Sequence, residues 1–126
     1  MLHIAAVHVG VGEGSAGHEQ SEERDVVSVD GNMKTKIEAS RLLTWKSAYE
    51  ADNGVRNTES AAHAKRFAAD TAMEVSTDAV QIFGGYGYSE EYPVARLMRG
   101  AKVMQIYEGS SQVQRMIIGR EITKNF

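Results

Sequence analysis

The chain has 126 residues, of which 42% are hydrophobic and 25% charged, a composition typical of one modest globular domain. Its net charge of -3 gives no electrostatic signature for nucleic acid or an anionic membrane surface, and no apolar run is long enough to span a bilayer. There is no cysteine, and the four histidines are scattered without ligand spacing, so we expect neither a disulfide nor a metal site.

Residues 1–32 form an extension that we leave unassigned and expect to be irregular or, at most, a β-hairpin between the apolar runs 2–11 and 26–29. Residues 12–17 formally match the dinucleotide fingerprint G-x-G-x-x-G. The segment that follows, HEQSEERD, has no apolar residue to pack on a sheet, so a glycine-rich tail is favoured over a nucleotide site. Neither a secretory signal nor an Arg-rich transit peptide is recognisable. We therefore expect a cytoplasmic protein, or a mitochondrial-matrix protein if the chain is eukaryotic.

From residue 33 the pattern becomes helical. An apolar side over 34–52 predicts a first helix, ended by Asn53-Gly54, with Trp45 packed in the core. Apolar residues every three or four positions over 58–83 predict a second helix that begins at an Asn57 or Thr58 cap. The short link between them indicates an antiparallel hairpin.

The segment GGYGY after residue 83 interrupts the helical pattern, and its glycines allow a ligand or another backbone to approach closely. Pro93 is a suitable first residue for a third helix over 93–105. A capping box of Ser111 with Gln114 predicts a last helix over 111–123. We expect its buried face to be apolar, formed by Val113, Met116, Ile117 and Ile122.

Glu108 lies between the apolar run that ends at Tyr107 and the glycine that opens the last helix. Burial among apolar neighbours disfavours a charged carboxylate, which would strengthen Glu108 as a general base. The amide N–H groups from Gly109 onward lie at the positive end of a helix, where an anion or polar cofactor group can bind. From these residues alone, a loop acid without a catalytic role is the alternative.

The block QIFGGYGYSEEYPVARLMRGAKVMQIYEGSSQVQRMIIGRE resembles the C-terminal signature of the flavin-dependent acyl-CoA dehydrogenases, and a sparser match extends back to about Met33. The resemblance implies an all-α, partial up-down helical bundle over 33–126. In this family an N-terminal helical domain, a β domain and the start of the bundle precede it. The glycine at 100 departs from the acidic residue usual in the family.

The resemblance also implies an activity, the FAD-dependent conversion of an acyl-CoA thioester to a trans-2-enoyl-CoA. Glu108 aligns with the base that removes the α-proton, and its amide, with a flavin ribityl hydroxyl, would polarise the thioester carbonyl. Tyr107 and Gly109 would flank the acyl chain. The cofactor contacts implied are Ser110 and Gln112 and, against the flavin of a neighbouring subunit, Gln81, Gly84 and Gly85.

Partners implied by the resemblance are electron-transfer flavoprotein and further copies of the chain in a homo-oligomer. The alternative function is a non-catalytic helical oligomerisation module derived from the same family. In either case we expect the isolated chain to expose a long apolar face and to self-associate.

Overall fold

The computed structural model describes the backbone of residues 16–124 and the side chains of residues 31–124. This part of the chain is all-helical, as expected, and contains no strand. The five helices are α1 (Ala16–Asp52), α2 (Thr58–Phe83), α3 (Gly85–Tyr88), α4 (Pro93–Met104) and α5 (Ser111–Thr123). The predicted bounds of α2 and α5 are confirmed, and α4 ends one residue earlier than predicted.

Helix α1 is longer than the sequence pattern indicates, because it begins at Ala16. The short strand expected over 26–29 is therefore wrong, because these residues are helical. The polar segment HEQSEERD contains good helix formers and no proline. Gly31, further along α1, does not end the helix, because a single glycine inside a helix costs only about 1 kcal/mol. The rest of the expected hairpin, at 2–11, and most of the glycine motif lie outside the described residues.

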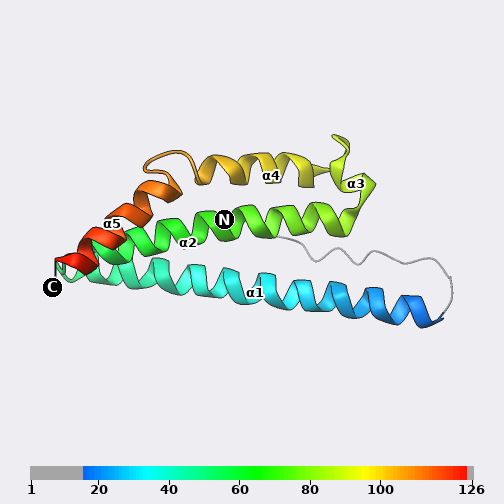
Figure 1. Ribbon diagram of the computed structural model, residues 1–126, viewed down its shortest axis with the longest axis horizontal. Helices are drawn as coiled ribbons and strands as arrows, with labels where there is room; N and C mark the ends of the chain where they lie inside the picture. Colours follow the sequence, from blue (N-terminus) through cyan, green and yellow to red (C-terminus); the bar gives the residue numbers. More distant parts are fainter. Residues whose placement is uncertain (1–15, 125–126) are drawn as a thin grey trace.

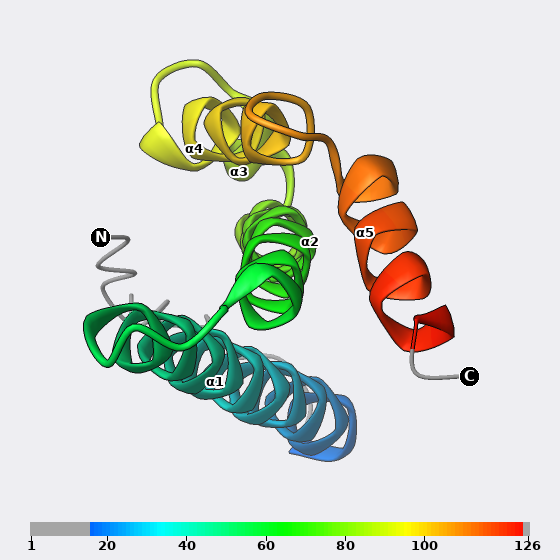
Figure 2. The same ribbon diagram turned by 90° about the vertical axis from the view of Figure 1, so that its left-hand side faces the viewer.

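Helix α2 is the centre of the structure. It runs antiparallel to α1 on one side, and α4 returns along its other side (Figure 1). Viewed from the end, α2 lies between α1 and α4, with α5 beside it (Figure 2). Among the described helices, α1 and α5 each pack on α2 and on no other helix. The arrangement is therefore a partial bundle organised by a single helix.

The contacts of α2 are made by small side chains. Its buried residues are Ser60, Ala62, Ala64, Ala69, Thr71, Val75 and Ser76. Small residues let neighbouring backbones come close. They also bury little apolar area, and each Å² of buried apolar area stabilises the fold by only about 25 cal/mol. No large side chain is fully buried within residues 31–124. The core of this part of the chain is thin.

Two expectations about burial are wrong for a shared reason. Trp45 is 62% exposed rather than packed in the core, because it projects from the side of α1 that α2 does not cover. Helix α5 turns Ser111, Gln114 and Glu121 inward and leaves Met116 73% exposed, the reverse of the predicted face. Large apolar side chains of both helices are thus left uncovered, although Met33 on α1 is buried and Ile117 on α5 is half-buried.

The turn between α2 and α4 requires glycine at particular places. Gly84 has φ +57°, a left-handed conformation that ends α2. Gly87 lies against the preceding helix, where an added Cβ would be 2.5 Å from the Val80 carbonyl oxygen. The GGYGY segment, expected only to interrupt the helix, forms the short helix α3 packed on α2.

Polar contacts join the α1–α2 link to its neighbours. Asn57 is the N-cap residue of α2, but its amide donates to the Ser47 carbonyl oxygen, at 3.1 Å, rather than capping the helix. The Arg56 guanidinium donates to Glu121 Oε1 at 3.0 Å and so connects the link to α5. Glu121, only 7% exposed, also accepts from Lys124 Nζ at 2.7 Å.

We predict opposite effects of alanine at two helical glycines. At Gly100, inside α4, an added Cβ meets nothing within 4 Å, so Gly100→Ala should stabilise the chain by roughly 0.5–1 kcal/mol. Gly87→Ala should destabilise it by about 1–3 kcal/mol through overlap with α2. Urea unfolding of the two variants and the unchanged chain measures both, and a stabilising Gly87→Ala would refute the close contact.

A second prediction concerns the pH dependence of stability. The hydrogen bond from Lys124, together with the nearby Arg56 charge, lowers the pKa of Glu121 below its ordinary value of 4.5. A carboxyl whose pKa is lower in the folded state stabilises the fold above its unfolded-state pKa and loses that contribution as the pH falls. Glu121→Gln should therefore lower the Tm at pH 7, with the difference from the unchanged chain shrinking below about pH 4.5. A Tm difference that is constant from pH 7 to pH 3 would contradict this.

The third prediction is that the isolated chain self-associates. Leu42, Trp45 and Tyr49 follow a spacing of three and four on α1 and are all exposed, forming an uncovered apolar stripe. Sedimentation at high concentration should detect oligomers, and Trp45→Lys should weaken them. Thr77→Lys, at an exposed position of α2, adds the same single charge and is the control. A strict monomer would exclude the idea.

Candidate active site

The predicted base lies in a short loop between α4 and α5. Tyr107, Glu108 and Gly109 follow a turn at Gln105–Ile106, and Ser110 is the N-cap residue of α5. Glu108 has φ +50° and Gly109 φ +89°, so two successive residues are left-handed. Glu108 is the one non-glycine residue with positive φ in the described chain. Such a conformation costs about 1–3 kcal/mol and persists only where surrounding contacts impose it.

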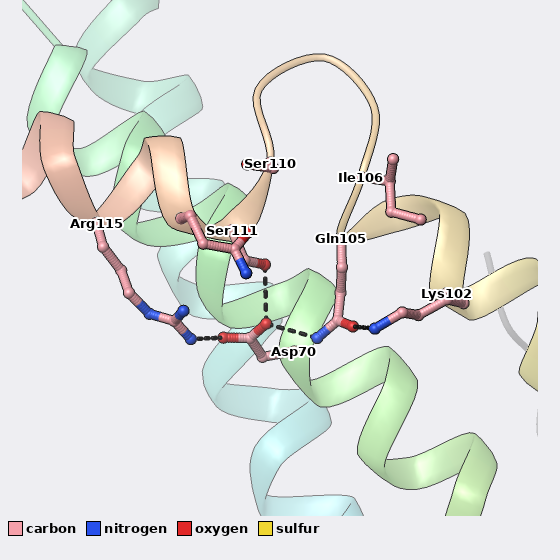
Figure 3. A pocket seen from close by; sticks show the side chains of 8 residues that line it. Asp70, Lys102, Gln105, Ile106, Ser110, Ser111 and Arg115 are labelled. Atoms are coloured by element: carbon pink, nitrogen blue, oxygen red, sulfur yellow. Dashed lines mark hydrogen bonds and ion pairs between the residues drawn. The ribbon is translucent and has the colours of Figure 1, made fainter.

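The neck of this loop is closed by the backbone and by one carboxylate. The Ser111 amide donates to the Gln105 carbonyl oxygen at 3.0 Å, which joins the two ends of the loop. Asp70 Oδ1, from α2, accepts from Gln105 Nε2 at 2.7 Å and from Ser111 Oγ at 2.8 Å. Asp70 Oδ2 accepts from the Arg115 guanidinium at 3.0 Å (Figure 3). Sequence reasoning did not identify Asp70, which looks like one more polar position on an alanine-rich helix.

The loop also contacts α2 at Lys65. The Lys65 ammonium donates to the Met104 carbonyl oxygen at the end of α4 and lies 4.9 Å from the centre of the Tyr107 ring. A cation over an aromatic face is attractive by about 0.5–2 kcal/mol. The Tyr107 hydroxyl donates to Met104 Sδ at 2.9 Å. Tyr107 is thereby held at one orientation beside Glu108.

Gly109 is required by the start of α5. An added Cβ there would be 2.5 Å from Gln114 Nε2, and that amide donates to the Gly109 carbonyl oxygen at 3.2 Å. The capping box predicted from Ser111 and Gln114 is therefore wrong. Ser110 is the cap, accepting from the Val113 amide at 3.4 Å, and Ser111 instead donates to Asp70.

Tyr107 and Glu108 lie over a cavity of about 470 Å³ between α1 and α2. Its walls are mainly small side chains from these helices: Thr44, Ser47, Ala48, Ala61, Ala64, Ala68 and Ala69. Asn57, Lys65 and Met104 complete the lining. The burial expected for Glu108 is not found, because its side chain is exposed in this chain. A carboxylate thus stands at the open side of a mostly apolar hollow.

A second cavity, of about 430 Å³, is lined by residues from α2, the end of α4 and the start of α5 (Figure 3). It is lined by Ser110 and Gln112, two of the predicted cofactor contacts. Lys102 and Arg115 add positive charge to its wall, alongside the Asp70 carboxylate. This polar cavity adjoins the N-terminus of α5.

The other predicted cofactor contacts form a separate group at the far end of α2. Gln81 is exposed in the last turn of that helix, and Gly84 and Gly85 follow it. At Gly85 an added Cβ meets nothing within 4 Å, so its missing side chain leaves the backbone open to solvent rather than to internal packing. Along α2, Gln81 is about 16 Å from the level of Asp70, from the 1.5 Å rise per residue. One chain does not bring the two groups together.

Among the residues that the structure describes, no three potential ligands from His, Asp and Glu gather in a form suited to a metal ion. Over the same range, no helix has the length and hydrophobicity needed to cross a bilayer.

These features define an all-helical domain with a carboxylate on a constrained loop beside a helix N-terminus. The family model for the C-terminal domain of acyl-CoA dehydrogenases matches residues 21–123, beginning ahead of the boundary that we expected at 33. The chain belongs to the acyl-CoA dehydrogenase family.

Two curated relatives illustrate the match. The cyclohexane-1-carbonyl-CoA dehydrogenase of Geobacter metallireducens is 47% identical over 108 residues, 86% of this chain and 28% of the relative. The short-chain-specific acyl-CoA dehydrogenase of Megasphaera elsdenii is 60% identical over 88 residues, 70% of this chain and 23% of the relative. The chain thus spans about a quarter of the length of these proteins.

Solved structures agree with this. Butyryl-CoA dehydrogenase from Megasphaera elsdenii superposes with a TM-score of 0.80 at 49% identity, over 88% of this chain and 29% of that one. A chain from the structure of the electron-transferring flavoprotein of Acidaminococcus fermentans gives a TM-score of 0.79 at 47% identity, over 87% and 29%.

Proposed function

We propose that this chain is the C-terminal catalytic portion of an enzyme that oxidises an acyl-CoA thioester to a trans-2-enoyl-CoA, with Glu108 as the base. The observation that carries the proposal is the constrained loop that holds Glu108 and Tyr107 over an apolar cavity. Membership of the acyl-CoA dehydrogenase family supports the reaction class.

The chemistry asked of Glu108 is removal of a weakly acidic proton from the carbon next to the thioester carbonyl. A positioned base contributes about 10²–10⁴-fold to such a step, and hydrogen-bond donors must hold the developing enolate oxygen. The backbone amide of Glu108 is our candidate donor. Glu108 has a left-handed backbone conformation, so its amide is not part of a helix. Because Glu108 is exposed in this chain, exclusion of water from the site falls to parts of the enzyme beyond it.

The residues present fit a flavin dinucleotide. Ser110 provides a hydroxyl and Gln112 an amide, and both lie next to the first backbone amides of α5. Lys102 and Arg115 add positive charge, and together these donors suit a pyrophosphate. We propose FAD as the cofactor, and when bound it would accept the hydride that leaves the β-carbon of the substrate.

The separation of the two contact groups favours an oligomer. We propose that Ser110 and Gln112 contact one flavin, whereas Gln81, Gly84 and Gly85 contact the flavin of a neighbouring subunit. The open backbone at Gly85 and the outward apolar sides of α1 and α5 are consistent with a surface that another subunit covers.

The substrate class that we propose is a CoA thioester with a hydrogen on its α-carbon. The named relatives act on cyclohexane-1-carbonyl-CoA or on short-chain acyl-CoA substrates, and both classes share this bond. We further propose electron-transfer flavoprotein as the electron acceptor, supported by the chain that superposes from such a structure. The named relatives come from bacteria, so the cytoplasm remains the proposed compartment.

A non-catalytic oligomerisation module is the second candidate. The thin core and the uncovered stripe on α1 favour it, because both features suit a chain that functions by associating with other subunits. Purified chain that retains no yellow flavin when mixed with FAD, yet forms helical oligomers, would support this alternative.

The catalytic prediction requires the rest of an enzyme. Residues 21–126 should be joined to the preceding portion of the Megasphaera elsdenii enzyme, at the start of the family match so that most of α1 is kept. In this fusion, Glu108→Gln keeps size and hydrogen bonding but cannot accept a proton. Turnover of butyryl-CoA should fall by about 10²–10⁴-fold.

The controls separate chemistry from cofactor retention. Glu90→Gln, at an exposed loop position without a side-chain hydrogen bond or ion pair to the described residues, should leave turnover unchanged. Gln81→Ala and Gln112→Ala should lower flavin content before they affect the rate per bound flavin, whereas Glu108→Gln should keep its flavin. Near-normal turnover by Glu108→Gln would mean that the base is a carboxylate outside this chain.

A further inference from the structure

We propose that Asp70 is a positioning residue for Glu108, holding the neck of its loop against α2. This role deepens the proposed function, because its catalytic meaning rests on Glu108 being the base. The arrangement of donors around the Asp70 carboxylate is the evidence for it (Figure 3).

Asp70 joins the two ends of the loop through one oxygen atom. Oδ1 accepts from Gln105, just after α4, and from Ser111, the first residue of α5. Since the five residues between these donors include the base, the oxygen sets how far apart α4 and α5 lie at the loop. The backbone bond from Ser111 to Gln105 closes the same neck but has no connection to α2.

The second oxygen of Asp70 fixes the direction of α5. Oδ2 accepts from Arg115, one turn into α5, and Arg66 lies 3.8 Å away on the same helix as Asp70. Charge-assisted hydrogen bonds of this kind are roughly twice as strong as neutral ones. The carboxylate is 28% exposed, so these contacts are screened only in part by water.

The position of Asp70 along α2 relates the loop to the cavity. Ala68 and Ala69, which line the cavity, immediately precede Asp70, and Lys65 contacts Tyr107 a little more than one turn earlier. Helix α2 therefore holds the loop at its neck through Asp70 and beside the base through Lys65. The two left-handed residues, Glu108 and Gly109, lie between these points. Releasing the neck should let them relax and move the carboxylate away from the cavity.

The test uses the full chain and amide hydrogen exchange. The Ser111 amide donates to the Gln105 carbonyl oxygen across the neck and reports its closure, and the amides of Ile106 and Tyr107 donate to the Val103 carbonyl oxygen and report the junction of the loop with α4. Asp70→Ala leaves Gln105 and Ser111 without their acceptor and should speed exchange at these amides by about tenfold or more. Exchange in the first turns of α2, around residues 60–64, should change little.

Two further variants distinguish positioning from general destabilisation. Asp70→Asn keeps an acceptor oxygen for Gln105 and Ser111 but cannot accept from Arg115 in the same way, so it should restore most of the protection at the loop. Asp78→Ala, two turns further along α2 and without a hydrogen bond or ion pair to the described residues, controls for loss of an acid from this helix. It should leave loop exchange unchanged.

Unchanged loop exchange in Asp70→Ala, or an equal rise throughout α2, would overturn the proposal. In the fusion enzyme, Asp70→Ala should lower kcat by about ten- to a hundredfold, the cost of misplacing a reacting group, while KM changes little. An inactive unsubstituted fusion would contradict the proposed function, whereas the exchange result would still decide whether Asp70 holds the loop.

Discussion

The structure depends on how closely other helices can approach α2. Alanine and serine along this helix allow α1 and α4 to pack on its opposite sides and α5 to pack on it as well. A larger side chain at Ala64 or Ala69 would fill the cavity beneath Glu108 as well as separate the helices. The same small residues therefore determine both the packing of the bundle and the space at the site.

Close packing of small side chains leaves much apolar surface on the outside. The stripe on α1 and the outward face of α5 carry more large hydrophobic side chains than the buried core does. The chain spans about a quarter of the length of the two named relatives, and under the proposed function the rest of the enzyme and other subunits would cover this surface. The exposure of Glu108 fits the same proposal, because a base that removes a weakly acidic proton would need a water-poor site.

Local sequence patterns predicted the helices well and the faces of the helices poorly. Pro93 marks the start of α4, because proline restricts its own backbone to a conformation that suits the first residue of a helix. The glycines at 84 and 85 mark the end of α2, because glycine can adopt backbone conformations that end a helix. The inward face of α5 was missed because its inward residues are polar and satisfied by partners far away in the sequence, such as Arg56 for Glu121. Periodicity identifies the apolar side of a helix whether or not it is covered, and it gives no signal for a polar side that packs inward.

Some residues of the candidate site could likewise be predicted from the sequence, and others could not. Family resemblance identified Glu108 and its neighbours, but Asp70, Lys65 and Arg115 came only from the structure, since each acts across 35 or more residues of sequence. The extension of α1 to Ala16 was also missed, because a polar segment without an apolar face gives no periodic signal.

In the proposed function, Glu108 is the base at the reacting carbon of an acyl-CoA thioester. A crystal structure of the fusion enzyme with a bound, non-reacting acyl-CoA analogue tests this role most directly. We expect a Glu108 carboxylate oxygen about 3–3.5 Å from the α-carbon, with the loop neck still closed on Asp70. A Glu108 side chain directed into solvent, with another carboxylate at the α-carbon, would contradict it.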